Sequence, residues 1–140
     1  MADLDLEFDV ATEAPLPPGL DLAGWPRLAR LVLSEERASG AWTIAVALVD
    51  DARIRALHRA FMDVDTATDV ITFPAAAPGE PPSGGDIAIS VERAQAQASD
   101  FGLSPAAETT FLLVHGLLHL CGWDDATPAE RTRMLERGRA

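Results

Sequence analysis

The chain has 140 residues, of which 48% are hydrophobic and 24% charged, and its formal net charge is −11. This composition excludes an intrinsically disordered chain, and the length fits one domain over residues 1–140. The negative charge excludes a general attraction to nucleic acids, so RNA contact would need a local group of arginines. No apolar run approaches the roughly 20 residues that cross a bilayer, and the acidic start is unlike a signal peptide. With Cys121 as the one cysteine, we expect a cytoplasmic protein without disulfides or membrane contacts.

The first third of the chain predicts a strand, a helix and a second strand. Residues 4–10 alternate between apolar and acidic or polar side chains, which is the period of a half-buried strand. Prolines and a glycine within 15–19 then break the chain. Residues 42–49 are almost wholly apolar and predict a strand that is covered on both faces. Between them a helix is predicted over residues 21–38, ending before Gly40, with apolar positions Leu22, Trp25, Leu28, Leu31 and Val32.

The middle of the chain predicts one helix and two short strands. Residues 69–73 and 85–90 have strand character, and the stretches 62–66 and 75–84 are polar or rich in proline and glycine, as in loops. Asp51 is the expected N-cap of the preceding helix. One side of this helix carries Ile54, Leu57, His58 and Phe61.

The last third of the chain is predicted to be helical. Residues 91–101 are rich in alanine and glutamine, and Ser104 followed by proline is a strong N-cap signal for a helix that stops at Gly122. A capping box at Thr127 predicts one more helix. About four strands and four to five helices in mixed order indicate an α/β or α+β fold with helices packed on a sheet.

A metal site is predicted at the end of the helix that stops at Gly122. His115 and His119 lie four residues apart on one helical face, so both imidazoles can reach a single ion. The glycine turns the chain back, and Asp125 follows at the spacing of a third ligand. Two imidazoles and one carboxylate leave an open fourth position on a tetrahedral zinc ion. That position is the mark of a catalytic site, where zinc lowers the pKa of water toward ~7.

Three other interpretations bear on this segment. Asp124 competes with Asp125 as the third ligand. Cys121 is a softer alternative ligand, but it points around the helix from the imidazoles and is better explained as a core residue. The ligand spacing also overlaps that of metzincin peptidases, which need a glutamate directly after the first histidine. Gly116 occupies that position, so peptide hydrolysis by that route is not expected.

Three segments together resemble the YbeY family of bacterial rRNA-maturation endoribonucleases. Residues 115–125 read HGLLHLCGWDD, against the family's His-Gly-x-Leu-His-Leu-x-Gly-Tyr/Trp-Asp-His. Residues 68–74 read TDVITFP, against Thr-Asp/Asn-Val-Leu-Ser-Phe-Pro, and residues 85–90 read GDIAIS, against Gly-Asp-Ile-x-Ile. The segments stand in the family's order and spacing within residues 45–136.

The resemblance implies a fold, a cofactor and a substrate. The fold is a single α/β (α+β) domain with a small, mostly parallel four-stranded sheet, packed helices and a metal site at the end of a central helix. The cofactor is one zinc ion. The implied activity is that of a zinc-dependent single-strand endoribonuclease in 16S rRNA 3′-end maturation and ribosome quality control. Its partners would be the small ribosomal subunit or its assembly proteins, with no DNA.

The chain departs from the family pattern at two positions. The usual third ligand is histidine, and Asp125 stands there; a carboxylate is an accepted zinc ligand. The family's functional arginine aligns with Met62, which cannot neutralise a phosphate. Arg59 lies one helical turn earlier, so it is the candidate catalytic arginine, or else a solvated surface residue.

Four further residues near these segments have possible site roles. The family places Thr68 near the site, so it is the candidate substrate-binding residue, whereas Asp69 is expected to satisfy backbone groups at the strand end. His58 replaces a family asparagine and is expected to pack beside Phe61. Trp123 can stack on a base but is expected to pack as the family's tyrosine does.

Two other functions compete with RNA cleavage. A ribosome-assembly factor that binds its partners with weak or no nuclease activity is favoured by Met62 and by the net charge of −11. A metal-dependent hydrolase of another substrate, such as a peptide, is disfavoured by Gly116.

Overall fold

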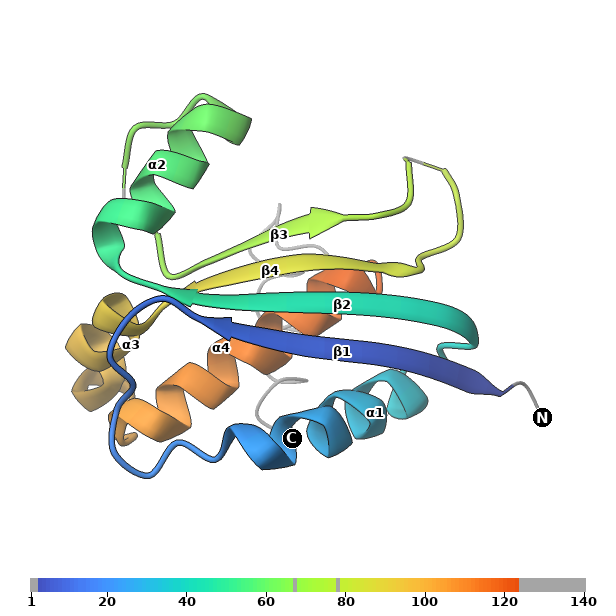
Figure 1. Ribbon diagram of the computed structural model, residues 1–140, viewed down its shortest axis with the longest axis horizontal. Helices are drawn as coiled ribbons and strands as arrows, with labels where there is room; N and C mark the ends of the chain where they lie inside the picture. Colours follow the sequence, from blue (N-terminus) through green and yellow to red (C-terminus); the bar gives the residue numbers. More distant parts are fainter. Residues whose placement is uncertain (1–2, 67, 78, 124–140) are drawn as a thin grey trace.

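The computed structural model describes residues 3–66, 68–77 and 79–123. Within these residues, strands and helices alternate up to α2 (Asp51–Met62), and two consecutive strands and then two consecutive helices follow (Figure 1). Short 3-10 turns at Leu22–Gly24 and Ser99–Phe101 flank two of the helices. The strands and helices are β1 (Leu4–Thr12), α1 (Trp25–Glu35), β2 (Gly40–Val49), α2 (Asp51–Met62), β3 (Val70–Pro74), β4 (Gly84–Ser90), α3 (Val91–Ala98) and α4 (Pro105–Leu120).

The four described strands form one mixed sheet in the order β1-β2-β4-β3. The β1–β2 and β2–β4 pairs are parallel, and β3 runs antiparallel to β4. A loop returns β3 directly onto β4, whereas the parallel pairs need helical crossovers. The predicted α+β class with a mostly parallel sheet is therefore confirmed, with β3 as the antiparallel strand.

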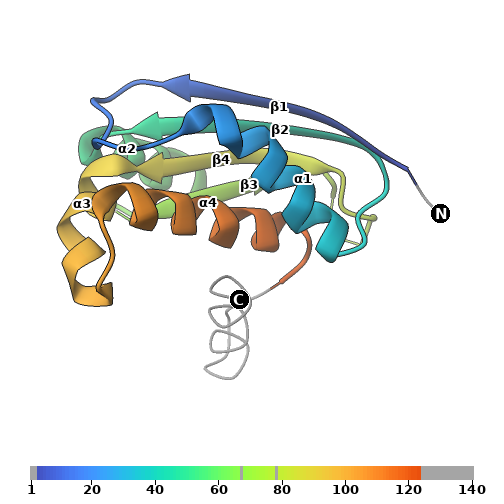
Figure 2. The same ribbon diagram turned by 90° about the horizontal axis from the view of Figure 1, so that it is seen from below.

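Helices α1, α3 and α4 cover one face of the sheet, and α2 packs on the other (Figures 1 and 2). The larger core lies between the sheet and the first group. In α1 the buried residues are Trp25, Ala29 and Leu33, one turn apart. The predicted apolar stripe was wrong at Leu31, which is 58% exposed, because the buried face is centred on Ala29.

The prediction that β2 is covered on both faces was also wrong. Trp42, Ile44 and Val46 are buried under the helices, but Thr43 and Ala45 between them are exposed. Helix α2 covers only the far end of the second face, where Ile54 packs with Val49, Ile71 and Ala88. We call the uncovered remainder the open sheet face.

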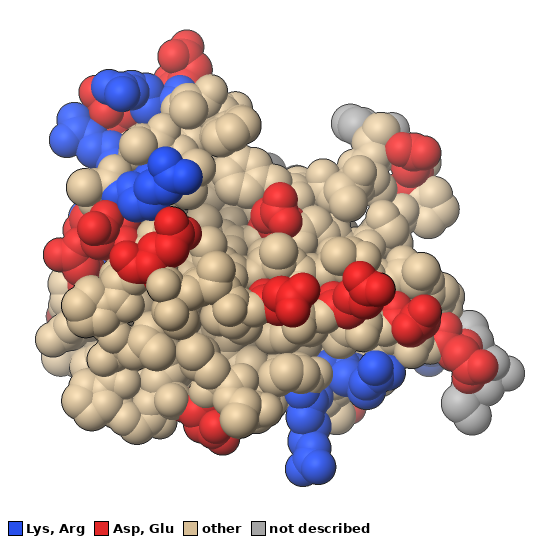
Figure 3. Space-filling model, viewed as in Figure 1, with Lys and Arg blue, Asp and Glu red and all other residues tan. Residues whose placement is uncertain are grey.

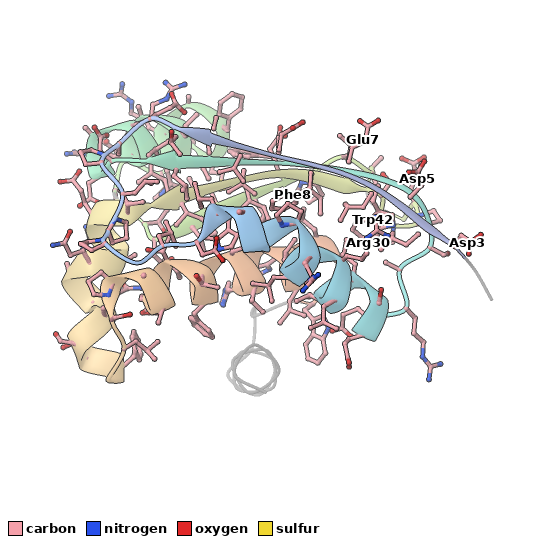
Figure 4. All side chains as sticks on the ribbon, turned by 60° about the horizontal axis from the view of Figure 1, so that its bottom comes forward. Asp3, Asp5, Glu7, Phe8, Arg30 and Trp42 are labelled. Atoms are coloured by element: carbon pink, nitrogen blue, oxygen red, sulfur yellow. The ribbon has the colours of Figure 1, made fainter. Side chains whose placement is uncertain are left out.

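An acidic row runs along β1 on the open sheet face. Asp5, Glu7 and Asp9 alternate with apolar residues that pack into the larger core. Asp5 and Glu7 point away from the helices, whereas Phe8 and Trp42 lie on the side of α1 (Figure 4). The row is continuous in the space-filling view (Figure 3). These three carboxylates thus lie on the face opposite α4.

Helix boundaries differ from the sequence predictions in three places. The predicted helix over 21–38 is a 3-10 turn followed by α1, which starts at Trp25 with proline in its first turn. The predicted helix over 91–101 is α3 followed by a 3-10 turn. The N-cap of α2 is Asp50, whose carboxylate accepts from Arg53 N at 2.7 Å, while Asp51 accepts from Ser90 Oγ at 2.6 Å.

The predicted N-cap of α4 is confirmed. Ser104 Oγ accepts from the backbone N–H of Ala107 at 3.1 Å, and proline occupies the first turn. Replacing Ser104 by alanine leaves that N–H without its cap, so we expect a loss of about 1 kcal/mol. Thermal unfolding should show a midpoint a few degrees lower. Ser104→Asp, which restores a capping oxygen, should recover it, and an unchanged midpoint in Ser104→Ala would contradict the capping role.

The helix predicted to begin at Thr127 lies outside the described residues. None of the described helices is both long enough and apolar enough to cross a membrane.

Candidate metal centre

Close packing on the sheet fixes the position of α4. Gly116 is buried, and a Cβ atom added there would lie 2.9 Å from Ile87 Cγ2 and 3.2 Å from Ile87 Cδ1. A side chain at position 116 would therefore collide with β4. The close approach places the helical turn from His115 to His119 beside the start of β4. It also leaves no room for the glutamate of a metzincin peptidase, in agreement with the expectation against that mechanism.

The two histidines of α4 face each other. Their Nε2 atoms are 3.2 Å apart, and the ring centroids are 4.9 Å apart at an angle of 61°. Both rings are half-buried, and the His115 ring also has an edge contact with Phe111. At this distance one imidazole can donate a hydrogen bond to the other. The same nitrogens converge on one point, as the i, i+4 spacing predicted.

The separation of the two nitrogens fits a shared zinc ion. Zinc–nitrogen bonds are about 2.05 Å long, so two ligands at a tetrahedral angle place their nitrogens about 3.3 Å apart. The observed 3.2 Å is close to this value. His115 and His119 thus have the donor type and spacing that the ion requires.

The third predicted ligand cannot be placed. Asp125 and its competitor Asp124 both lie outside the described residues. Within the described ranges, no group of three or more His, Cys, Asp or Glu side chains is arranged to hold a metal ion. The ligand role of Asp125 therefore stays a prediction.

A tight turn follows α4. The helix ends at Leu120, and Gly122 takes a φ of +105°, which L side chains rarely adopt. Trp123 N then donates to Leu118 O at 3.0 Å. The predicted glycine stop is confirmed, and the chain turns back along the helix instead of continuing past His119.

Trp123 connects this turn to the end of α1. It is half-buried, and its indole Nε1 donates to Glu36 Oε1 at 2.5 Å. The expectation that it is a packing residue agrees with this contact. Trp123→Phe keeps an aromatic ring but removes the donor, so we expect a loss of about 1.5–3 kcal/mol for a hydrogen bond to a charged group. Chemical denaturation measures this loss in the free energy of unfolding. Equal losses in Trp123→Phe and Trp123→Ala would contradict a packing role for the aromatic ring.

Cys121 is a core residue, as predicted. It is half-buried and packs against the larger core. Burial raises the pKa of its thiol to about 12, and the negative charge of Glu36 adds to the increase. Because the thiolate is the metal-binding form, this environment does not favour Cys121 as a ligand.

A hollow of about 450 Å³ lies beside His119. Its α4 side is formed by His119, Leu120 and Gly122, and the opposite wall is the loop between β3 and β4. Lining residues from that loop and its ends are Pro74, Ala76, Ala77, Gly79, Glu80, Pro82 and Gly84. The sequence predicted this loop but not its position beside His119, because that contact depends on the β3–β4 register.

The structure does not bring Thr68 to His119. Thr68 precedes β3, whose first residue, Val70, pairs with Ile89, whereas Pro74 at the other end lines the histidine hollow. These two ends of β3 are roughly 13 Å apart. Thr68 is half-buried. Its role as a substrate contact stays a prediction.

Asp69 has a structural role, but its side chain contacts another side chain and not the backbone groups that were expected. Its backbone oxygen accepts from Ser90 N at 2.9 Å, and its carboxylate accepts from Gln97 Nε2 at 3.2 Å. The same Gln97 amide lies 3.5 Å from Glu108, a buried residue in the first turn of α4. These contacts connect the start of β3 to α3 and α4.

Arg59 is not beside the histidines either. It is exposed in the last turn of α2, on the sheet face opposite α4, and its charge contributes to the lowered pKa of Asp65, after the larger effect of Arg55. The prediction that it replaces the family arginine remains untested. His58 does not simply pack beside Phe61, because its Nδ1 donates to Thr66 O at 3.0 Å.

The chain matches the family model described as "Endoribonuclease YbeY" over residues 23–140. This range extends through Asp125. Curated proteins named "Endoribonuclease YbeY" are also similar. The one from Roseiflexus sp. is 35% identical, covering 98% of this chain and 91% of the relative. The one from Moorella thermoacetica is 39% identical, covering 91% and 89%.

A solved structure has a similar fold. The solution structure of a Thermotoga maritima protein aligns with a TM-score of 0.61 and 24% sequence identity. The alignment covers 95% of this chain and 85% of that one. This likeness supports the arrangement of the sheet and helices.

Proposed function

Because this chain belongs to the endoribonuclease YbeY family, we propose that it is a zinc-dependent endoribonuclease that cleaves single-stranded RNA. The observation that carries the proposal is the pair of α4 imidazoles, with Nε2 atoms 3.2 Å apart beside an accessible hollow. The relatives carry a nuclease name, which favours cleavage over the alternative of an assembly factor with weak or no nuclease activity.

Side chains of α4 and the following turn would hold the metal. His115 and His119 offer imidazole nitrogens, and Asp125 offers a carboxylate as the third ligand. A zinc ion bound there would supply Lewis acidity toward a phosphate and lower the pKa of water. The Phe111 contact restricts the His115 ring, and the packing of Gly116 on Ile87 fixes the backbone between the two ligands.

The charge distribution is compatible with an RNA substrate despite the net charge of −11. The acidic row on β1 lies on the open sheet face (Figure 3), and the sheet separates it from α4. A strand that enters the hollow beside His119 therefore meets few of these carboxylates. Thr68 is proposed to contact the same RNA away from the cleaved phosphate, since it does not lie beside His119.

The proposed setting is the maturation of the 16S rRNA 3′ end and the quality control of ribosomes in the cytoplasm. The small ribosomal subunit or its assembly proteins would be the partners. DNA and membranes are not expected partners. The family membership and the single-stranded substrate class support this setting.

Cleavage of labelled RNA by the purified protein tests the proposal. Single-stranded RNA should be cut, the same sequence in a duplex should be spared, and a chelator should stop cleavage until zinc is added back. A wild-type protein with stoichiometric zinc that leaves single-stranded RNA intact would contradict it. A quenched peptide library serves as the control for another hydrolase activity and should remain uncut.

A further inference from the structure

A second hollow adjoins the one beside His119. It has a volume of about 230 Å³ and is lined by the end of α1, the β3–β4 loop and the residue after α4. Pro82 lines both hollows. Cys121 lines the second hollow, and its two neighbours in the sequence, Leu120 and Gly122, line the first. The two hollows therefore lie next to each other at the C-terminal end of α4.

Arg37 lines this second hollow. Its side chain is exposed, and within the described ranges no carboxylate forms an ion pair with it. Glu36 lines the same hollow, but its carboxylate accepts the indole N–H of Trp123. Among the described residues, the guanidinium of Arg37 therefore has no carboxylate partner.

Five other arginines of the described part have partners or positions away from this hollow. Arg30 donates to Leu4 O, Arg55 pairs with Asp65 and Arg93 pairs with Asp51. Arg53 and Arg59 belong to α2, on the opposite sheet face. Arg37, in contrast, lines a hollow whose wall also includes Cys121, the residue after α4.

We propose that Arg37 is an RNA-binding residue whose guanidinium contacts a backbone phosphate of the strand that runs from the second hollow past His119. The inference rests on the proposed function. A guanidinium presents paired N–H donors that match phosphate oxygens. Arg37 supplies this cation beside the end of α4.

The backbone conformation of Arg37 allows its side chain to be removed without straining the fold. Its φ is +61°, in the left-handed region that glycine adopts without strain. Arg37→Gly therefore removes the guanidinium while suiting the backbone, and the melting temperature should stay within a few degrees of wild type. Arg37→Gln keeps a polar, uncharged side chain, and Arg37→Lys keeps the charge.

The experiment measures the affinity of the zinc-loaded protein for a fluorescein-labelled single-stranded 2′-O-methyl RNA by anisotropy, at several salt concentrations. A gel confirms that the probe stays intact. Loss of one phosphate contact on a single strand should reduce the slope of log affinity against log salt by about 0.7, and the affinity about fivefold at 0.1 M salt. We expect this for Arg37→Gly and Arg37→Gln, with Arg37→Lys close to wild type.

Arg53→Gln is the matched control, because it removes one positive charge on the opposite face; its slope should equal that of wild type. If Arg37→Gly and Arg37→Gln keep the wild-type slope, Arg37 makes no phosphate contact and the inference is overturned while the proposed function stands. If Arg53→Gln lowers the slope equally, only net charge matters and the inference also fails. A wild-type protein that neither binds nor cuts single-stranded RNA overturns both.

Discussion

His119→Ala should abolish RNA cleavage, with a loss of about 10³-fold or more, because several kcal/mol of transition-state stabilisation depend on the ion that this residue helps to hold. His119 contributes one of two nitrogens that stand 3.2 Å apart, and a single imidazole cannot replace that pair. Initial rates on a single-stranded RNA measure the loss, with zinc supplied in excess.

Cys121→Ser is the matched control for this loss. It changes a half-buried core residue two positions further on and should keep near-wild-type cleavage and zinc content. Melting curves recorded in chelator should show that His119→Ala is folded. A His119→Ala protein that cuts RNA at the wild-type rate would exclude this histidine from the site, and loss of zinc in Cys121→Ser would identify the thiol as a ligand.

Gly116→Leu should destabilise the protein by about 3 kcal/mol or more, which is in the upper range for overpacking a core. A Cβ atom at this position already lies 2.9 Å from Ile87 Cγ2, and Ile87 is only 1% exposed, so helix and sheet must separate. Denaturant titration measures the free energy of unfolding. The gain in helix propensity over glycine, about 1 kcal/mol, is too small to offset the collision.

The partner of Gly116 provides the control. Ile87→Ala alone should cost about 2–5 kcal/mol as a cavity, but in the Gly116→Leu background it removes the colliding atoms and should cost much less. A double-mutant cycle gives the coupling between the two positions. Strictly additive losses would contradict the close contact between α4 and β4.

Much of the fold could be predicted because its signals are local. The alternation in β1 and the serine-proline start of α4 depend on residues a few positions apart, and both were confirmed. The coverage of β2 could not be predicted in this way. Its apolar run is compatible with burial on both faces, but the length of α2 decides how much of the second face is covered.

In the candidate site, too, local features could be predicted from the sequence and contacts between distant residues could not. The i, i+4 spacing of His115 and His119 places both rings on one helical face, and the structure brings their nitrogens together. The contacts of Trp123 with Glu36, 87 residues apart, carry no local signal. Arg37 was missed for a similar reason, because its position beside the end of α4 depends on how α1 and α4 pack on the same sheet face.

The metal content of the purified protein, measured by mass spectrometry, tests the central claim most directly. Wild-type protein should carry close to one zinc ion per chain, and His115→Ala and Asp125→Ala should each lose it, since three ligands are needed to hold a catalytic zinc. Asp124→Ala is the control that separates the two adjacent carboxylates, and it should retain the ion. Wild-type protein that is free of metal and does not take up added zinc would contradict the account.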